Sequence, residues 1–496
     1  MWTYYPELLA KPVPRYTSYP TAVEFGDAVG EADYARALDA IEPATPLSLY
    51  AHIPFCEQIC WYCGCNTGAA GRKQRLADYL VALRAEIAMV AKRIGGRARV
   101  QHIAFGGGSP NAVAPVEFVR ILDRLLTVFD VSRPEISIEI DPRGFTTEWA
   151  LVLAASNVTR VSLGVQTFAP HIQQAIGRVQ PLRDIEATVA ALRLRGIDAI
   201  NFDLMYGLPG QSIADLDATL DETIRLAPSR IALFGYAHLP AMLPRQRRIH
   251  ATDLPDDRLR FEQAAHGFER LTAAGYIPVG FDHFVLPGDP LAAAAKAGRV
   301  NRNFQGFTED DAPVLLGFGA SAISRFPGLI VQNEKRAGPY RDLIGEGRLA
   351  AVRGVAVGED DRLRGAIIKA ILCQGRAALP AAWADAARPA LTDVAQRGLI
   401  RWDGDELVLG DGSQPYARTI AARFDRFRGT IAPADTAAIE KAVARAESDA
   451  FRATLSGLVN PYGDGHASAR IVSVLRDVPL DMRLMTKRFH DLEALS

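Results

Sequence analysis

Four of the five cysteines lie within ten residues of one another, at Cys56, Cys60, Cys63 and Cys65. Thiolates are soft ligands that bind iron–sulfur clusters or zinc. The spacing of the first three would place three thiolates on one short loop. A 4Fe–4S cluster normally takes four cysteines, so three would leave one iron open to bind another molecule. Structural zinc is the alternative, but it usually needs two separated ligand pairs, and no second pair follows at a finger-like distance.

Other residues that suit ligand binding are spread along the next 150 positions. Gly106-Gly107-Gly108 could bring backbone N–H groups close to a ligand, and Ser109 follows them. Glu139 lies in an alternating apolar segment, where an inward-facing carboxylate could hold ribose hydroxyls. Three further polar side chains together suit a second polar ligand: Gln166, Arg178 and Asp203.

The elements that must position these residues alternate between short apolar runs and longer segments of helical period. Strands are predicted over residues 48–53, 102–105, 135–140, 161–165, 199–204 and 230–236, with helices such as 76–93 and 115–129 between them. About six strand–helix repeats predict an α/β fold with a parallel sheet. We expect an incomplete (β/α)6 barrel, in which function lies at the carboxyl ends of the strands.

The candidate residues follow these strands in order. The cysteine loop follows the first strand and the glycine run the second, and Glu139, Gln166, Asp203 and Ala237 lie at the ends of the next four. Because the carboxyl ends of parallel strands meet at one edge of the sheet, these residues should line one site.

Five segments are expected along the chain. They are an N-terminal arm (1–46) with a short helix near 31–41, a barrel (47–256), a barrel extension with the substrate region (257–345), a helical C-terminal domain (346–428) and a tail (429–496). A hairpin around Asp403-Gly404 gives the fourth segment a winged-helix-like pattern. Such a module could bind DNA or act as a lid, and the absence of a basic recognition helix favours the lid.

Charge and hydropathy exclude several classes of protein. Lys plus Arg total 56 and Asp plus Glu total 57, so the net charge does not predict a polyanion-binding protein, and any nucleic-acid site would need a local basic patch. We find no apolar run long enough for a membrane span and no signal peptide. A cytosolic location is therefore expected, where clustered cysteines indicate a metal site. Cys373, alone in an apolar run, is interpreted as a buried helix residue.

The spacing C-x3-C-x2-C after a short strand resembles the signature of the radical S-adenosylmethionine (SAM) superfamily. The resemblance implies that Cys56, Cys60 and Cys63 bind three irons of a 4Fe–4S cluster, whose fourth iron chelates SAM. Reduction would then release a 5′-deoxyadenosyl radical. It also implies that the glycine run receives the methionine amino group and that Cys65 is not a ligand.

Longer stretches between about residues 12 and 428 resemble the oxygen-independent coproporphyrinogen III oxidases. They are residues 14–22, 49–56, 63–66, 201–209, 236–240, 282–284 and 303–307. The resemblance implies a heme-biosynthetic oxidoreductase that decarboxylates two propionates of coproporphyrinogen III to give protoporphyrinogen IX. It further implies a monomer that receives electrons from a reduced flavodoxin- or ferredoxin-type donor.

The resemblance also implies two bound SAM molecules and assigns residues to each. The first would contact Tyr50, which also joins the three cysteines as a catalytic candidate, and Gly107, Glu139, Ala237 and Ile323. The second would contact Tyr62, Gly108, Ser109, Gln166, Arg178 and Asp203. The tetra-anionic substrate needs cations, for which arginine is best suited. Candidates from the matching motifs are Arg15, Arg248 and Arg302.

The chain departs from the pattern of that family at Gly235, Thr167 and Gly177 and in Ser109-Pro110-Asn111. These departures leave open a methyl-transferring, ring-opening heme enzyme of the same family. A porphyrin-binding protein with a vestigial radical core is the non-enzymatic alternative. Residues 456–471 resemble the end of hydrolysing UDP-N-acetylglucosamine 2-epimerases, and we interpret the tail as a fused remnant without epimerase activity.

Overall fold

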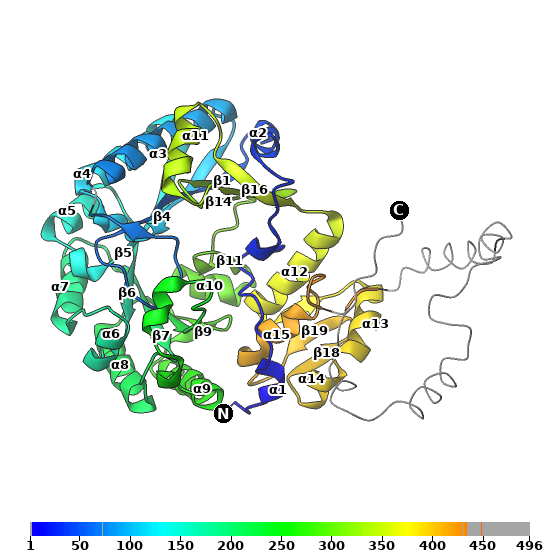
Figure 1. Cartoon of the computed structure of the whole chain (residues 1–496). Coiled ribbons are helices and arrows are strands. Elements are labelled where there is room, and N and C mark those ends of the chain that lie inside the picture. The colour runs from blue at the N-terminus through cyan, green and yellow to red at the C-terminus, as the bar shows by residue number, and fades with distance from the viewer. Residues whose placement is uncertain (1, 72, 430, 434–447, 449–496) are drawn as a thin grey trace, which may run out of the picture. The chain divides into compact units, whose positions relative to one another are not determined.

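The six strands expected from the sequence pair in chain order as parallel neighbours in the computed structural model, which describes residues 2–71, 73–429, 431–433 and 448. They are β1 (Pro46–Ile53), β4 (Arg99–Gly107), β5 (Asp130–Ile140), β6 (Arg160–Gln166), β7 (Ala199–Tyr206) and β8 (Arg230–Gly235). The crossover helices are α3 (Lys73–Ile94), α4 (Pro115–Val128), α5 (Thr147–Ala155), α6 (Pro170–Ala175), α7 (Leu182–Arg193) and α8 (Ile213–Leu226). The predicted α/β barrel-like fold is confirmed (Figure 1).

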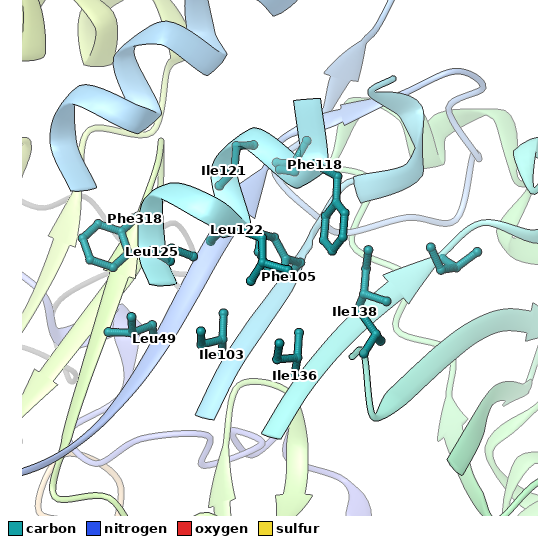
Figure 2. Close-up of a cluster of buried hydrophobic side chains, with 14 of the residues drawn as sticks. Leu49, Ile103, Phe105, Phe118, Ile121, Leu122, Leu125, Ile136, Ile138 and Phe318 are labelled. Carbon is teal, nitrogen blue, oxygen red and sulfur yellow. The ribbon is translucent and has the colours of Figure 1, made fainter. Parts of the chain in front are cut away.

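Helix α4 illustrates how the helices cover the sheet. It begins with Pro115, whose fixed φ and missing N–H suit the first helical position. Its buried residues Phe118, Ile121, Leu122 and Leu125 recur at helical spacing on one face. They pack on apolar side chains of β4 and β5, and Phe105 lies at the centre of this contact (Figure 2).

A seventh parallel strand, β13 (Val314–Phe318), was not predicted. It pairs with β1, and all five of its residues are buried, so it lacks the alternation that marks a half-exposed strand. Antiparallel strands extend the sheet beyond it: β14 (Ile323–Phe326), β15 (Leu329–Asn333) and β16 (Ala351–Ala356). At the other edge lie β10 (His283–Val285) and β9 (Ile277–Val279).

Shorter elements join these parts. They are the strands β2 (Phe55–Cys56), β3 (Gly68–Ala69), β11 (Asn301–Asn303) and β12 (Gly306–Thr308), and the helices α9 (Asp257–Ala273), α10 (Pro290–Lys296) and α11 (Ala337–Gly345). The pair β11–β12 includes Asn303, Gly306 and Phe307, which belong to the matching stretch 303–307.

The C-terminal domain is mostly helical, as expected. It contains α12 (Glu359–Gln374), α13 (Ala381–Ala390), α14 (Thr392–Gln396) and α15 (Ala417–Ala422). A small sheet of β17 (Arg376–Ala378), β19 (Glu406–Leu409) and β18 (Ile400–Asp403) includes the predicted hairpin. Its turn has Gly404 at φ +57, which glycine adopts readily. Cys373 is buried on α12, as interpreted from the sequence.

The first part of the N-terminal arm, with α1 (Pro6–Leu9), lies against this domain (Figure 1). Its second part carries α2 (Glu31–Asp39), which packs on α3 and β16. The fully buried carboxylate of Asp425 accepts hydrogen bonds from the Tyr16 hydroxyl at 2.9 Å and the Tyr19 hydroxyl at 3.4 Å. The Tyr416 hydroxyl donates to the Thr3 carbonyl at 2.6 Å. The arm is thus held by contacts that span about four hundred positions of sequence.

The chain up to Ala432 forms one compact unit. Ile431 belongs to it, because Arg364 Nη1 donates to the Ile431 carbonyl at 2.9 Å. The tail segment 456–471, with its resemblance to an epimerase terminus, lies outside the described residues. Among the helices that the structure describes, none has the length and apolarity needed to cross a membrane.

Candidate active site

A cavity of about 620 Å³ lies at the carboxyl ends of the parallel strands. Most residues singled out from the sequence line it: Arg15, Cys56, Cys60, Tyr62, Cys63, Cys65, Gly107, Gly108, Glu139, Gln166, Arg178, Asp203 and Ala237. Five others do not line it: Tyr50, Ser109, Arg248, Arg302 and Ile323. The structure thus brings most of the predicted residues together at the strand ends, and the ligand that each would contact stays a prediction.

The cysteine loop begins at β2 and is fastened on two sides. The Trp61 N–H donates to the Ile176 carbonyl at 2.9 Å, which joins the loop to the end of α6. Gln246 Nε2 donates to the Tyr62 carbonyl at 2.7 Å, which joins it to the loop after β8. The three thiols consequently face the cavity from a loop held at both flanks.

Two arginines surround the buried Cys60. Arg143 Nη2 and Arg178 Nη1 each lie 3.3 Å from Cys60 Sγ. Asp141 pairs with both guanidinium groups, at 2.6 Å from Arg143 and 3.3 Å from Arg178. Both guanidinium groups therefore place hydrogen-bond donors and positive charge against this sulfur.

The neighbouring cysteines differ in environment. A hydrogen bond from Cys65 is the main cause that lowers the pKa of Cys63 to about 6, and the Cys65 N–H lies 3.4 Å from Cys63 Sγ. Burial raises the pKa of Cys56 to about 12. In the part of the chain that the structure describes, no three His, Cys, Asp or Glu side chains converge on a single ion position.

The glycine run forms a cradle that side chains would fill. A Cβ on Gly108 would lie 2.5 Å from the Phe55 carbonyl oxygen. Gly107 has φ +116, and a Cβ there would lie 2.6 Å from the His52 ring. The Gly107 N–H donates to Glu139 Oε2 at 3.2 Å. Only glycine lets this strand end approach both the cysteine loop and the carboxylate.

Glu139 and Asp203 are two carboxylates on one cavity wall. Burial, reinforced by the charge of Asp203, raises the pKa of Glu139 to about 7. Burial also raises the pKa of Asp203, which accepts hydrogen bonds from Ser162 at 3.0 Å and Asn201 at 2.9 Å. Beside them Gln166 has φ +67 at a bulge between β6 and β7. A strained residue at a strand end is typical of a functional site.

The predicted residues outside the lining stand behind it. The Tyr50 hydroxyl lies 3.0 Å from His52 Nδ1, under the glycine run. Ser109 Oγ donates to Asn111 Oδ1 at 2.7 Å, and Asn111 in turn bonds the main chain of Asp141. Ile323 begins β14 next to Gly317. These predicted residues are thus described by their local contacts, and none of them is part of the cavity lining.

The three candidate arginines have different positions. Arg15 lines the cavity, with its guanidinium carbon 4.6 Å from the centre of the Phe234 ring. Arg248 is exposed and stacks on Trp61 at 5.3 Å. Arg302 is buried between the rings of Phe281 and Phe307. The sequence motifs thus identified the part of the chain that carries these arginines, but tertiary packing decides how deeply each side chain is buried.

The departures from the family pattern have local structural explanations. Thr167 is fully buried and its Oγ1 lies 3.2 Å from Thr219 Oγ1 on α8, away from the cavity lining. Gly235 lines the cavity, and a Cβ there would lie 2.9 Å from the Tyr206 hydroxyl. Gly177 has φ +64, and a Cβ there would lie 2.7 Å from the Trp61 ring. Gly177 therefore makes room for the indole that fixes the cysteine loop.

Replacing Gly177 by alanine should destabilise the protein by about 2 kcal/mol or more, because left-handed strain adds to a clash with Trp61. Gly196→Ala is the matched control, since Gly196 has φ +79 with open space around it. Thermal unfolding of the two variants measures the difference. Equal midpoints would show that Trp61 does not press on Gly177.

Several cavity residues were not predicted. Asp141 and Arg143 lie just beyond the end of β5, so the strand-end rule that found Glu139 could have found them. The loop after β8 adds Arg245 and an apolar rim of Leu239, Met242 and Leu243. Met242 is 77% exposed and so leaves an apolar side chain open to solvent at the cavity rim.

Comparisons with known proteins agree with this site. Residues 50–223 match the family model of the radical SAM superfamily. The oxygen-independent coproporphyrinogen III oxidase of Bradyrhizobium diazoefficiens is 43% identical over 427 residues, which cover 83% of this chain and 94% of the relative. That of Pseudomonas aeruginosa is 38% identical, with 84% and 93% covered. The structure of coproporphyrinogen III oxidase from Escherichia coli, a radical SAM enzyme, superposes with a TM-score of 0.81 at 34% identity, covering 86% of this chain and 99% of that one.

Proposed function

Because this chain belongs to the oxygen-independent coproporphyrinogen III oxidases of the radical SAM superfamily, we propose that its cavity decarboxylates two propionates of coproporphyrinogen III to vinyl groups, giving protoporphyrinogen IX. The observation that carries the proposal is the meeting of three thiols, a glycine cradle and paired carboxylates in one cavity. The chain is thus an oxidoreductase of heme biosynthesis, and the family implies a 4Fe–4S cluster and SAM.

The residues present fit the cluster. We assign Cys56, Cys60 and Cys63 as its ligands, because all three line the cavity together with Gly107 and Gly108. When bound, the cluster and SAM supply a 5′-deoxyadenosyl radical that abstracts a hydrogen atom from the propionate β-carbon. Arg143 and Arg178 hold positive charge against Cys60 Sγ and so offset the negative charge of a thiolate-bound group.

We assign the residues that hold SAM as follows. The Gly107 main chain, Glu139 and Ala237 would contact a first molecule, supported by Tyr50 and Ile323 from behind the wall. A second molecule would lie against the remaining polar residues: Tyr62, Gly108, Gln166, Arg178 and Asp203. Ser109 would position that wall through Asn111. Gly164 supports this arrangement, because a Cβ there would lie 2.9 Å from Arg178 Nη2.

The substrate is a tetra-anion with an apolar macrocycle. Arg15 offers its guanidinium from the cavity wall, and the apolar rim of Leu239, Met242 and Leu243 offers a surface for pyrrole rings. Arg248 stacks on Trp61 and Arg302 is buried, so neither offers a direct contact from the lining. We further propose a monomeric cytosolic protein that is reduced by a flavodoxin- or ferredoxin-type donor.

The test is an anaerobic turnover assay. Protein with a reconstituted cluster is mixed with reductant, SAM and coproporphyrinogen III, and products are identified by mass spectrometry. We expect 5′-deoxyadenosine together with mono- and divinyl products. Deoxyadenosine without vinyl product would reject the substrate and retain the radical chemistry, and neither product would favour a porphyrin-binding protein.

The affinity for SAM should depend on pH through Glu139. Its pKa of about 7 means that the carboxyl is mostly protonated at about pH 6 and mostly ionised at about pH 8. An ionised carboxylate accepts hydrogen bonds from the ribose hydroxyls of SAM and attracts its sulfonium. The affinity for SAM should therefore rise with pH over this range, by at most about tenfold per pH unit, and level off above it.

Anaerobic calorimetry of SAM binding at several pH values measures this dependence. Glu139→Gln should bind more weakly and lose the part of the pH dependence that Glu139 contributes. Glu148→Gln, which changes an exposed carboxylate, is the matched control. A Glu139→Gln protein with the pH profile of the unchanged chain would remove Glu139 from the ligand set.

A further inference from the structure

Three arginines from distant parts of the chain converge behind one end of the cavity. They are Arg15 on the arm, Arg302 on β11 and Arg418 on α15. Arg302 Nε donates to the Arg15 carbonyl at 3.1 Å, and Arg418 Nη1 donates to the Val13 carbonyl at 3.4 Å. The guanidinium carbons of Arg302 and Arg418 lie 4.7 Å and 5.4 Å from the same ring, that of Phe281. Arg302 and Arg418 thus bind the main chain of the arm, and the arm itself carries Arg15.

This group carries more positive than negative charge. Among the described residues, Asp282 is the carboxylate that forms an ion pair with one of these three arginines. Its Oδ1 lies 3.9 Å from Arg302 Nη1. Asp282 is also shared with His283, whose Nδ1 lies 2.7 Å away. Although burial acts to raise it, the charges of His283 and Arg302 lower the pKa of Asp282 to about 2. One carboxylate therefore offsets three guanidinium groups.

A buried charge without a counter-charge lowers the stability of the folded protein, so buried arginines of this kind call for a functional explanation. Burial lowers the pKa of both Arg302 and Arg418, which shows that each cation is short of compensation. Arg302 Nη1 is buried with no hydrogen-bond partner. The Arg15 side chain contacts the Phe234 ring and forms no ion pair within the described residues. Donors and charge are both available for an anion.

We propose that Arg15, Arg302 and Arg418 form a subsite for one propionate carboxylate of the substrate. Arg15 contacts the carboxylate from the cavity wall, while Arg302 and Arg418 supply positive potential from behind it and seat the arm. The proposal rests on the proposed function for the identity of the carboxylate. Arg418 is the residue that the sequence motifs did not suggest, because it lies in the C-terminal domain and belongs to no motif of the barrel.

The subsite depends on docking of the arm. Tyr16, next to Arg15, is held by Asp425, which lies seven positions beyond Arg418. The same C-terminal segment therefore supplies one arginine and fixes the position of another. This explains in physical terms why a mostly helical domain packs against the arm of a barrel enzyme.

The test measures binding of coproporphyrin III, the stable oxidised tetra-acid, to the cluster- and SAM-loaded protein by absorbance titration. The neutral tetramethyl ester is the paired probe. Arg418→Gln should weaken binding of the tetra-acid at least about tenfold and leave the ester within about twofold. Arg418→Lys should retain most of the affinity, because it retains the charge.

Arg423→Gln is the matched control, since Arg423 ends the same helix but pairs with Asp393 at 2.9 Å. Arg15→Gln gives a second test, because within the described part of the chain the Arg15 side chain forms no ion pair and its contact is with the Phe234 ring. Unaltered tetra-acid binding in Arg418→Gln and Arg15→Gln would overturn the subsite, as would equal losses for acid and ester. Vinyl formation by the unchanged chain reports separately on the proposed function.

Discussion

Cys60→Ala should abolish turnover of coproporphyrinogen III, lowering it by at least about a thousandfold, or about 4 kcal/mol of transition-state stabilisation. Cys60 is the buried member of the three thiols, and its sulfur is the point at which Arg143 and Arg178 meet. Its removal would delete a ligand and leave Asp141 as the acceptor that Arg143 and Arg178 share. Iron content, cluster absorbance and turnover measure the loss.

The other cysteines supply the controls. Cys373→Ala removes a buried thiol on α12 and should retain the iron content and turnover of the unchanged chain. Cys65→Ser should retain iron, because Cys65 is assigned as a donor to Cys63 and not as a ligand. A Cys60→Ala protein that kept its cluster would contradict the ligand assignment, and loss of the whole cluster in Cys65→Ser would contradict the three-ligand set.

Gly108→Ala should lower turnover by about a hundredfold or more. The new methyl group would lie 2.5 Å from the Phe55 carbonyl oxygen, and a backbone atom cannot rotate away as a side chain can. Overpacking of this kind costs about 1–3 kcal/mol. Relief requires movement of β2, which carries Cys56, relative to the glycine run that would receive SAM. SAM affinity and turnover should therefore fall together.

Gly71→Ala is the matched control, because Gly71 lies just beyond β3 with open space around the position of its Cβ. It should leave SAM affinity and turnover near those of the unchanged chain. Calorimetry of SAM binding and the anaerobic assay compare the two variants. Full SAM affinity in Gly108→Ala would show that the cradle tolerates a methyl group and that the close approach to β2 has no role.

The barrel strands, and the edge of the sheet at which the site lies, could be predicted from the sequence because both follow from local sequence patterns. Short apolar runs that alternate with helical segments marked β1 and β4 to β8, and the position of polar residues after strands placed the site. Strand β13 is also a short apolar run, but it stands outside these strand–helix repeats. Its pairing with β1 depends on partners nearly 270 positions away.

The depth of individual side chains was not predicted from the sequence. Tyr50 and Ile323, assigned as SAM contacts by resemblance, do not line the cavity, and their contacts with SAM stay predictions. Arg302 belongs to a motif, but only packing places it between two phenylalanine rings. Arg418 could not be found at all, because no local signal joins a helix near the C-terminus to an arm near the N-terminus. Such contacts follow from the tertiary fold and not from spacing.

The most direct test of the account follows the hydrogen atom. Coproporphyrinogen III deuterated at the β-carbons of its propionates is incubated anaerobically with cluster-loaded protein, reductant and SAM. Mass spectrometry should find one deuterium in the 5′-deoxyadenosine that accompanies each vinyl group formed. Vinyl product accompanied by deoxyadenosine without deuterium would contradict abstraction from the propionate by the radical formed in this cavity.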